Sequence, residues 1–367
     1  MTVYVLFLAF VFLWAALCYS RKTDKRKNEI LFLNVVWIAM FLLCALRASS
    51  VGRDLPGYEL AYNQSDLFDW DNFDYVYFEN GYVFLMKICS KLLHLPFQGY
   101  LAVVSAIIMV PIYIYIRKYS KNPFISTLVY VCYMFFEFNM TGIRQALAAS
   151  VVLIAYMVYI SAKRFPRIWF ILIVLVAAQL HNAAWICLAF PILSYVKNMR
   201  LYTTIIAVCS FALLGLRGTI MSYIKDFFEK ESMDADAGVY FGMNFVFTVG
   251  LVMLFLFSYA KLIRTDSGSG IDGERAAALC HDDVHIKLFM LSIPAIILFG
   301  ADTAARSYMM FSQVMIVQLS NALYCWNPRD RKLLQLIFVL FLAVFFFTNT
   351  LIPNNFDIVP YDFFWQK

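Results

Sequence analysis

Charged residues are scarce in this chain of 367 residues, and their scarcity excludes most classes of soluble protein. Only 15% of the residues are Asp, Glu, Lys or Arg, whereas 62% are apolar. A soluble domain usually has about 25% charged and roughly 45–50% apolar residues, and one soluble core stops growing at about 250–300 residues. The excess apolar surface must therefore face lipid, which excludes a soluble enzyme, a disordered chain and a small secreted scaffold.

Motifs for metal, disulfide and nucleotide chemistry are also lacking. The eight cysteines form no CxxC pair and lie mostly in apolar runs, where free Cys behaves as a small hydrophobic residue. Segment 280–285 has two His four residues apart, but no third distant ligand is evident, so we predict no metal site and no cofactor. The absence of a GxxxxGK[ST] loop argues against ATP-driven transport, and the absence of a visible repeat argues against a repeat-built transporter.

Long apolar runs dominate what is present, and they predict an all-α, polytopic integral membrane protein. A spanning helix needs roughly 17–25 mostly apolar residues. We predict twelve spans, some of them short, at 2–19, 30–47, 99–116, 123–138, 144–160, 168–180, 183–195, 201–217, 243–260, 286–300, 307–324 and 333–350.

The distribution of Lys and Arg predicts the orientation. The first span has no basic residue before it and the basic run 21–27 after it, which is opposite to a secretory signal. Segment 81–95 is placed as an interfacial or re-entrant helix on the outer side, because a span there would put the basic loop 117–121 outside, against the positive-inside rule. Both termini then lie outside, and most Lys and Arg lie in inner loops.

No soluble domain is appended, so residues 1–367 are predicted to form one membrane domain. Segments 48–98 and 218–242 are its predicted extracytoplasmic loops, the first containing the interfacial helix. Segment 261–285 is predicted to be a flexible cytoplasmic loop, because it is rich in Gly and Ser.

Polar residues at membrane depth are costly and usually functional, and here they gather at the outer ends of the spans. Arg144 lies at the start of a predicted helix, where a cation is disfavoured. An anion bound there would be held by the guanidinium and by free backbone N–H groups. The alternative is an arginine that snorkels to the interface; the neighbouring Gln145 and the other outer arginines favour the anion site.

Two further outer turns have two interpretations each. Asp302 and Arg306 are four residues apart, so a helix would pair them, although Arg306 can also face a cavity. His181, within the polar turn 179–182, is either a hydrogen-bonded packing residue or a functional group.

The outer loop 48–80 is acidic and aromatic. These residues suit sugars, because carboxylates accept hydroxyl hydrogen bonds and rings stack on apolar sugar faces; the alternative is an interfacial aromatic belt with a solvated acidic face. The C-terminal aromatic run 361–365 allows the same two interpretations. The loop contains Asp54, Glu59, Asp66, Asp69, Asp71, Asp74 and Glu79, against Arg53, together with Tyr58 and seven other aromatic residues.

The order of these motifs resembles the EpsG family of bacterial polysaccharide polymerases, relatives of the Wzy O-antigen polymerases. The resemblance covers nearly the whole chain, and its most specific element is G-I-R-Q-A-L-A at 142–148. The usual E-P-G-Y of the family reads E-N-G-Y at 79–82. The other matching residues are Arg47, Arg53, Asp54, Tyr58, Asn139, His181 and Arg306.

The resemblance implies a helical, GT-C-like glycosyltransferase that polymerises lipid-linked repeat units at the outer face of the bacterial cytoplasmic membrane, in capsule, exopolysaccharide or O-antigen synthesis. Its ligands would be a polyprenyl pyrophosphate-linked oligosaccharide and membrane lipid. Its partners would be a flippase and a chain-length regulator, with no nucleic acid.

Our mechanistic hypothesis assigns two tasks. Arg144 would stabilise the departing pyrophosphate, because fixed cations should face developing negative charge. His181 is the first choice for the base that takes the acceptor hydroxyl proton, because its ordinary pKa of about 6.5 suits that task, and Asp54 and Glu79 are alternatives. The predicted substrate-binding residues are Arg47, Arg53, Tyr58, Tyr82, Asn139, Gln145 and Arg306.

Three other functions are compatible with parts of the pattern. A flippase or transporter of lipid-linked sugars would need a polar path to the inner side, whereas the polar residues stop at the outer ends. A membrane O-acyltransferase typically has an early intramembrane His, and no His precedes His94. A ligase would share the same site chemistry.

Overall fold

The computed structural model describes residues 1–74, 76–228, 243–266 and 273–366, and the side chains at 224–228, 243–244, 262, 264–266, 273–281 and 300–306 lie outside what it describes. Helices make up the described secondary structure, without a named strand, and an isolated antiparallel bridge joins Arg47 to Phe363. The all-α prediction is confirmed at this level.

The chain divides into two compact units, and the single membrane domain expected over residues 1–367 stays a prediction. The first comprises Met1–Ile154, Val176–Asn182 and Trp326–Lys367, and the second comprises Ala155–Leu175 and Ala183–Cys325. The first unit is therefore assembled from three separate stretches of sequence.

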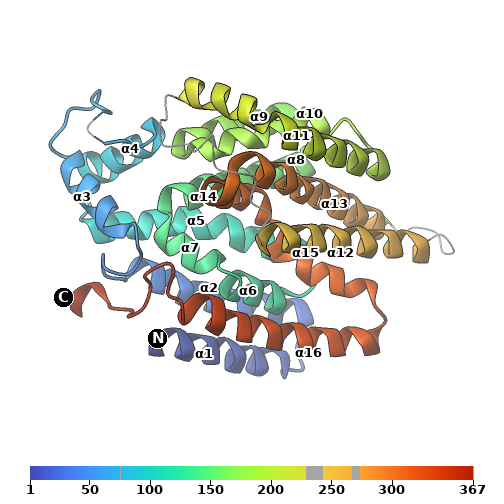
Figure 1. Cartoon of the computed structure of the whole chain (residues 1–367). Helices are drawn as coiled ribbons and strands as arrows, with labels where there is room; N and C mark the ends of the chain where they lie inside the picture. Colours follow the sequence, from blue (N-terminus) through green and yellow to red (C-terminus); the bar gives the residue numbers. More distant parts are fainter. Residues whose placement is uncertain (75, 229–242, 267–272, 367) are drawn as a thin grey trace. The chain divides into compact units, whose positions relative to one another are not determined.

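Long helices form the body of the first unit. Helices α1, α2, α5, α6 and α16 run beside one another, and the two chain termini lie at the same end (Figure 1). Trp37 fixes α2 in this body, because its ring stacks on Tyr130 at 5.4 Å and its indole N–H donates to the Met109 carbonyl at 3.0 Å. The bounds are α1 (Thr2–Tyr19), α2 (Lys25–Ala45), α3 (Leu55–Ser65), α4 (Asn80–Lys87), α5 (Phe97–Tyr119), α6 (Pro123–Cys132), α7 (Phe135–Thr141) and α16 (Pro328–Phe345).

Side-chain caps fix where several of these helices begin. The Asp24 carboxylate accepts from the backbone N–H groups of Arg26 and Lys27, so α2 begins before the predicted start at residue 30. Asn327 caps α16 in the same way, with Pro328 at the first helical position. Short polar acceptors satisfy N–H groups that the first turn leaves free, and Pro at this position loses no hydrogen bond.

The predicted span 123–138 is broken. Helices α6 and α7 are bent by 48° across a short break at Met134, whose φ is +66°. Segment 81–95 forms α4 followed by a π-helical turn at Ile88–Leu92.

The second unit contains the longest helices of the C-terminal half. The Lys287 ammonium contacts the Asp283 carboxylate at 2.7 Å and donates to the Lys197 carbonyl at 2.9 Å, which joins α13 to the start of α11. The bounds are α10 (Ala189–Leu193), α11 (Met199–Phe228), α12 (Met243–Asp266), α13 (Gly273–Met290), α14 (Ser292–Ser312) and α15 (Met315–Ala322). Helices α8 (Ile143–Ser161) and α9 (Pro166–Leu180) contribute to both units.

The predicted boundaries in the second unit were partly wrong. Helix α14 runs through 301–306, where we expected an outer turn between two spans. The segment Ala-Asp-Thr-Ala-Ala-Arg contains no Pro or Gly, so nothing in it interrupts a helix. Helix α13 covers residues 273–285 of the predicted cytoplasmic loop 261–285, and α11 extends to residue 228 of the predicted extracytoplasmic loop 218–242. The side of the membrane on which these two segments lie stays a prediction.

Six described helices are long and apolar enough to cross a membrane, and the bent α6–α7 pair makes a seventh if it counts as one span. Four shorter apolar helical segments fall below that length: Pro166–Leu180, Asn182–Leu193, Phe245–Lys261 and Met315–Cys325. By length and composition, the described chain is that of a polytopic membrane protein, and the count of twelve spans stays a prediction.

Candidate functional site

A partly buried ion pair between Glu79 and Arg144 forms the centre of the candidate site. Glu79 directly precedes α4, and Arg144 is the second residue of α8. Arg144 Nη1 lies 2.7 Å from Glu79 Oε2, and the two side chains are 21% and 8% exposed. The other carboxylate oxygen, Oε1, accepts from the backbone N–H of Asn182 at 3.1 Å. Glu79 thus neutralises Arg144 within the protein, and the binding of a substrate anion at the start of α8 stays a prediction.

Aromatic rings surround the Arg144 guanidinium. Its Cζ lies 4.3 Å from the centroid of the Phe78 ring, which is cation–π geometry. The Arg144 guanidinium donates a hydrogen bond to the Tyr58 hydroxyl oxygen, and the Tyr82 hydroxyl acts on Arg144 electrostatically. The three rings pack on one another with centroids 5.5–5.8 Å apart. The cluster therefore holds the guanidinium in one orientation.

Close packing of Gly81 brings the turn 179–182 to the carboxylate. A Cβ on Gly81 would lie 2.6 Å from the Gln179 Cβ and 2.7 Å from the Gln179 carbonyl oxygen, so only glycine fits here. Helix α9 ends at Leu180, and His181, which is half-buried, follows it. His181 lies close enough to lower the pKa of Glu79 electrostatically.

The electrostatics of the cluster keep Glu79 ionised. Burial acts to raise the pKa of its carboxyl, but Arg144, His181 and the Asn182 amide together hold that pKa below its usual value. The Tyr58 hydroxyl changes in the other direction, because burial raises its pKa despite the nearby Arg144. Glu79 is therefore a hydrogen-bond acceptor and counter-ion in this state.

Several predicted residues thus meet in one place. Arg144, Glu79, Tyr58, Tyr82 and His181 lie together in the first unit. Asp54 is exposed at the start of α3 and acts electrostatically on Tyr58, so it lies near the edge of the cluster.

Arg47 lies elsewhere, in the interior. It is 1% exposed, and its guanidinium donates to the carbonyls of Cys44 and Met140, the latter at 3.0 Å. These carbonyls lie near the ends of α2 and α7, where helices leave acceptors unsatisfied. These two hydrogen bonds explain why Arg47 is buried: it joins the ends of two helices. Its role in substrate binding stays a prediction.

Arg53 pairs with the C-terminal segment. Its Nε lies 2.9 Å from Asp357 Oδ2, and both side chains are more than half exposed. The preceding Gly52 has φ +122°, and a Cβ there would lie 2.7 Å from the Met140 carbonyl oxygen. The backbone N–H groups of Gly52 and Arg53 also donate to the carbonyls of Asp357 and Phe356. This turn fastens the C-terminal segment, and substrate contact by Arg53 stays a prediction.

Of the remaining predicted residues, the structure describes the side chains of Asn139 and Gln145 but not that of Arg306. Asn139 is buried and donates to the Tyr130 hydroxyl at 2.7 Å, and Gln145 is buried in the first turns of α8. The Arg306 side chain lies outside the described part of the chain. So do those of Cys280 and His281, and among described residues no group of three His, Cys, Asp or Glu could hold a metal ion. The absence of a metal in the function stays a prediction.

Sequence reasoning did not select Phe78, Gly81 or the Asn182 amide for the site. Their signals were weak but present. Phe78 precedes Glu79 directly, Gly81 lies in the E-N-G-Y motif, and Asn182 lies in the polar turn with His181.

The apolar helices define a helical membrane protein, and a partly buried arginine–glutamate pair surrounded by aromatic rings forms a polar site in its first unit. The EpsG family model matches residues 30–363. The chain therefore belongs to the EpsG family, a Wzy-like polymerase family with an exopolysaccharide role. No curated protein and no solved structure matches the chain.

Proposed function

We propose that this protein is a glycan polymerase. It transfers a growing polysaccharide from polyprenyl pyrophosphate to a lipid-linked repeat unit at the outer face of the bacterial cytoplasmic membrane, in capsule, exopolysaccharide or O-antigen synthesis. The supporting observation is the convergence of Arg144, Glu79 and His181 within a family of polymerases. A GT-C-like helical architecture is part of the proposal.

Arg144 is the proposed ligand of the leaving pyrophosphate. Nη1 is engaged by Glu79, whereas Nε has no hydrogen-bond partner among the described residues. A diphosphate is a stronger anion than one carboxylate and can accept two parallel N–H bonds from a guanidinium. An incoming donor substrate would therefore compete with Glu79 for Arg144 and loosen the ion pair.

Release of Glu79 would change its chemistry. Without the facing guanidinium, the pKa of the carboxyl rises towards and above its usual value, because burial then dominates. The freed carboxylate remains beside His181, which it can orient. Binding of the donor would thus prepare the base side of the same site.

The proposed step is a single substitution at the anomeric carbon. The acceptor hydroxyl oxygen forms the new glycosidic bond, the bond from the anomeric carbon to the pyrophosphate oxygen breaks, and polyprenyl pyrophosphate leaves with the electron pair. His181 takes the hydroxyl proton, a contribution typically worth ~10²–10⁴-fold. Glu79 and Asp54 are the alternative bases.

Contacts at the ends of the chain support the proposed topology. The Tyr4 hydroxyl donates to the Ile358 carbonyl at 3.1 Å, and the rings of Tyr4 and Tyr361 lie 5.8 Å apart. The two termini are therefore on one side of the first unit, as an even number of spans requires. We propose that this is the outer side, with twelve spans in total.

The proposal is tested with purified protein and one defined lipid-linked repeat unit, without nucleotide sugar or metal. A polymerase forms products of increasing length from this substrate alone, and unchanged repeat units in the presence of folded protein contradict it. The proposed partners are a flippase and a chain-length regulator. Adding them should change the supply of repeat units or the length of the polymer, but neither should be required for formation of the glycosidic bond.

Loss of the protein in cells separates the other functions. Single lipid-linked repeat units accumulating at the outer leaflet fit a polymerase. Repeat units trapped on the inner leaflet fit a flippase, and polymer of normal length without a decoration fits an O-acyltransferase. A ligase would leave finished polymer on its lipid carrier.

A further inference from the structure

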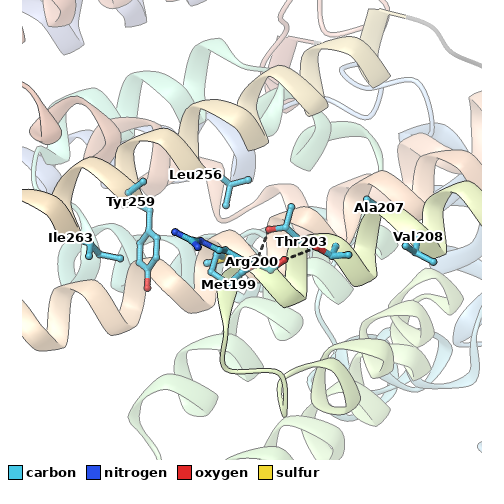
Figure 2. A pocket seen from close by; sticks show the side chains of 10 residues that line it. Met199, Arg200, Thr203, Ala207, Val208, Leu256, Tyr259 and Ile263 are labelled. Carbon is cyan, nitrogen blue, oxygen red and sulfur yellow. Dashed lines mark hydrogen bonds between the residues drawn. The ribbon is translucent and has the colours of Figure 1, made fainter.

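A groove runs between α11 and α12 in the second unit. It has a cavity volume of about 730 Å³. All its lining residues come from these two helices, which both pack on α13 and α14. Figure 2 shows the two helices passing each other with the lining side chains between them.

One end of the groove is polar and basic. Arg200, in the first turn of α11, projects beside Tyr259 of α12 (Figure 2). The Arg200 side chain is exposed, and no hydrogen bond or ion pair of its guanidinium is found among the described residues. Thr203 and Thr204 donate to the carbonyls of Met199 and Arg200 at 2.8 and 3.0 Å, and their oxygens keep lone pairs.

Neighbouring charges leave this end positive. The Tyr259 hydroxyl donates to Asp283 at 3.4 Å, and the Asp283 carboxylate is already paired with Lys287 at 2.7 Å. Asn198 accepts from the backbone N–H groups of Arg200 and Leu201. The positive character therefore comes from the Arg200 side chain rather than from a free helix N-terminus.

The rest of the groove is apolar and continues along the helices. Ala207 and Val208 line it about two turns after Arg200, and Leu256 lines it from α12. Helix α11 is a candidate membrane span, and Val208 is 63% and Phe211 78% exposed, as expected for a surface that faces acyl chains. Arg200 belongs to the short basic segment 197–200, Lys-Asn-Met-Arg, at the start of α11, which the positive-inside rule places at the cytoplasmic interface.

We propose that the groove binds an anionic phospholipid of the cytoplasmic leaflet. Its phosphate is held by Arg200, and one acyl chain lies along Ala207, Val208 and Leu256. A phospholipid fits both parts of the groove. Its negative headgroup lies at the membrane interface, beside Arg200, and its acyl chain extends into the hydrocarbon layer, along the apolar part of the groove. This inference is independent of the proposed polymerase activity.

The test is lipid binding to the full chain, measured by native mass spectrometry after detergent purification. Phosphatidylglycerol and phosphatidylcholine with the same acyl chains are compared. The wild type should retain phosphatidylglycerol more strongly, and Arg200→Gln should weaken that retention about fivefold, which corresponds to the ~1 kcal/mol expected of one basic residue near an anionic surface. Arg329→Gln is the matched control, because Arg329 is an exposed basic residue at the start of α16 in the first unit.

A second variant tests the acyl-chain part. Ala207→Phe should fill the groove and weaken binding of both lipids, whereas Ala212→Phe, an exposed position of α11 outside the lining, should not. Equal retention of the two lipids by the wild type, or unchanged phosphatidylglycerol binding in folded Arg200→Gln protein, overturns the proposal. Binding of a polyprenyl phosphate that Arg200→Gln weakens and that phosphatidylglycerol does not displace also overturns it, because the groove would then hold a different lipid.

Discussion

Gly81 lies directly against Gln179, so closely that a Cβ would come within 2.6 Å of the Gln179 side chain and 2.7 Å of its carbonyl oxygen. The contact joins the start of α4 to the end of α9. It sets the distance between Glu79, two residues before Gly81, and the Asn182 amide that the carboxylate accepts from. The geometry of the site therefore depends on glycine at position 81, because any side chain there would push the turn 179–182 away from Glu79.

Gly81→Ala should separate the turn 179–182 from Glu79. We expect overpacking to cost about 1–3 kcal/mol of stability, and polymer synthesis to fall more than stability, because both His181 and the Asn182 amide move. Initial rate and melting temperature would be measured together. Gly57→Ala is the control, because its Cβ would have no neighbour within 4 Å. A Gly81→Ala protein with wild-type rate contradicts the assignment.

Arg144→Ala should lower the polymerisation rate by about 10²–10³-fold, the usual loss for a donor that stabilises developing negative charge. Arg144→Lys keeps a charge but not the planar fork of donors, so we expect only partial recovery. The measurement is the initial rate of chain extension from a defined lipid-linked repeat unit. Long polymer at the normal rate from folded Arg144→Ala protein would remove Arg144 from the mechanism.

Glu79 should make the stability of the fold fall in acid. Its pKa in the folded protein lies below its usual value, so ionised Glu79 stabilises the fold fully above a pH of about 4.3, the ordinary value for Glu. This contribution is lost as the pH falls through the lower folded pKa. Glu79→Gln lacks it, so wild type should be more stable at pH 7, and the two melting temperatures should converge in acid. A gap that stays constant from neutral to strongly acidic pH is incompatible with this assignment.

The Arg53–Asp357 pair separates a structural role from a substrate role. The two side chains are 59% and 53% exposed, and exposed ion pairs contribute only about 0–1 kcal/mol. If Arg53 only fastens the C-terminal segment, Arg53→Ala and Asp357→Ala should have equal, small effects on melting temperature and activity. If Arg53 binds the pyrophosphate as predicted, Arg53→Ala alone should raise the KM for the lipid-linked donor.

Strong local signals made part of the fold predictable. The span predicted at 2–19 coincides with α1, because an uninterrupted apolar run ends at a basic segment. The turn predicted at 301–306 was wrong. It was placed there because Asp302 and Arg306 are polar, but two polar residues four positions apart fit readily into a helix. The bend at Met134 could not be predicted, since a left-handed residue other than Gly is selected by tertiary packing rather than by local sequence.

The candidate site was predictable in its residues but only partly in its geometry. Motif order selected Arg144, Glu79, Tyr58, Tyr82 and His181, which the first unit brings together. Nothing in the sequence indicated that Glu79 would itself neutralise Arg144. Arg47 resembles the other outer arginines in sequence, and only the three-dimensional arrangement shows that its partners are backbone carbonyls of two helix ends.

The division of the first unit into three stretches bears on how the protein is made. Residues 356–362 hydrogen-bond to the turn that follows α2, yet the ribosome synthesises them some three hundred positions later. The early helices are therefore inserted before residues 356–362 have been synthesised. The hydrogen bonds between these residues and the turn after α2 can form only after α16 has been inserted. Substitutions at Gly52 or Arg53, which contact residues 356–357, would accordingly impair this late step and leave incomplete intermediates exposed to membrane proteases.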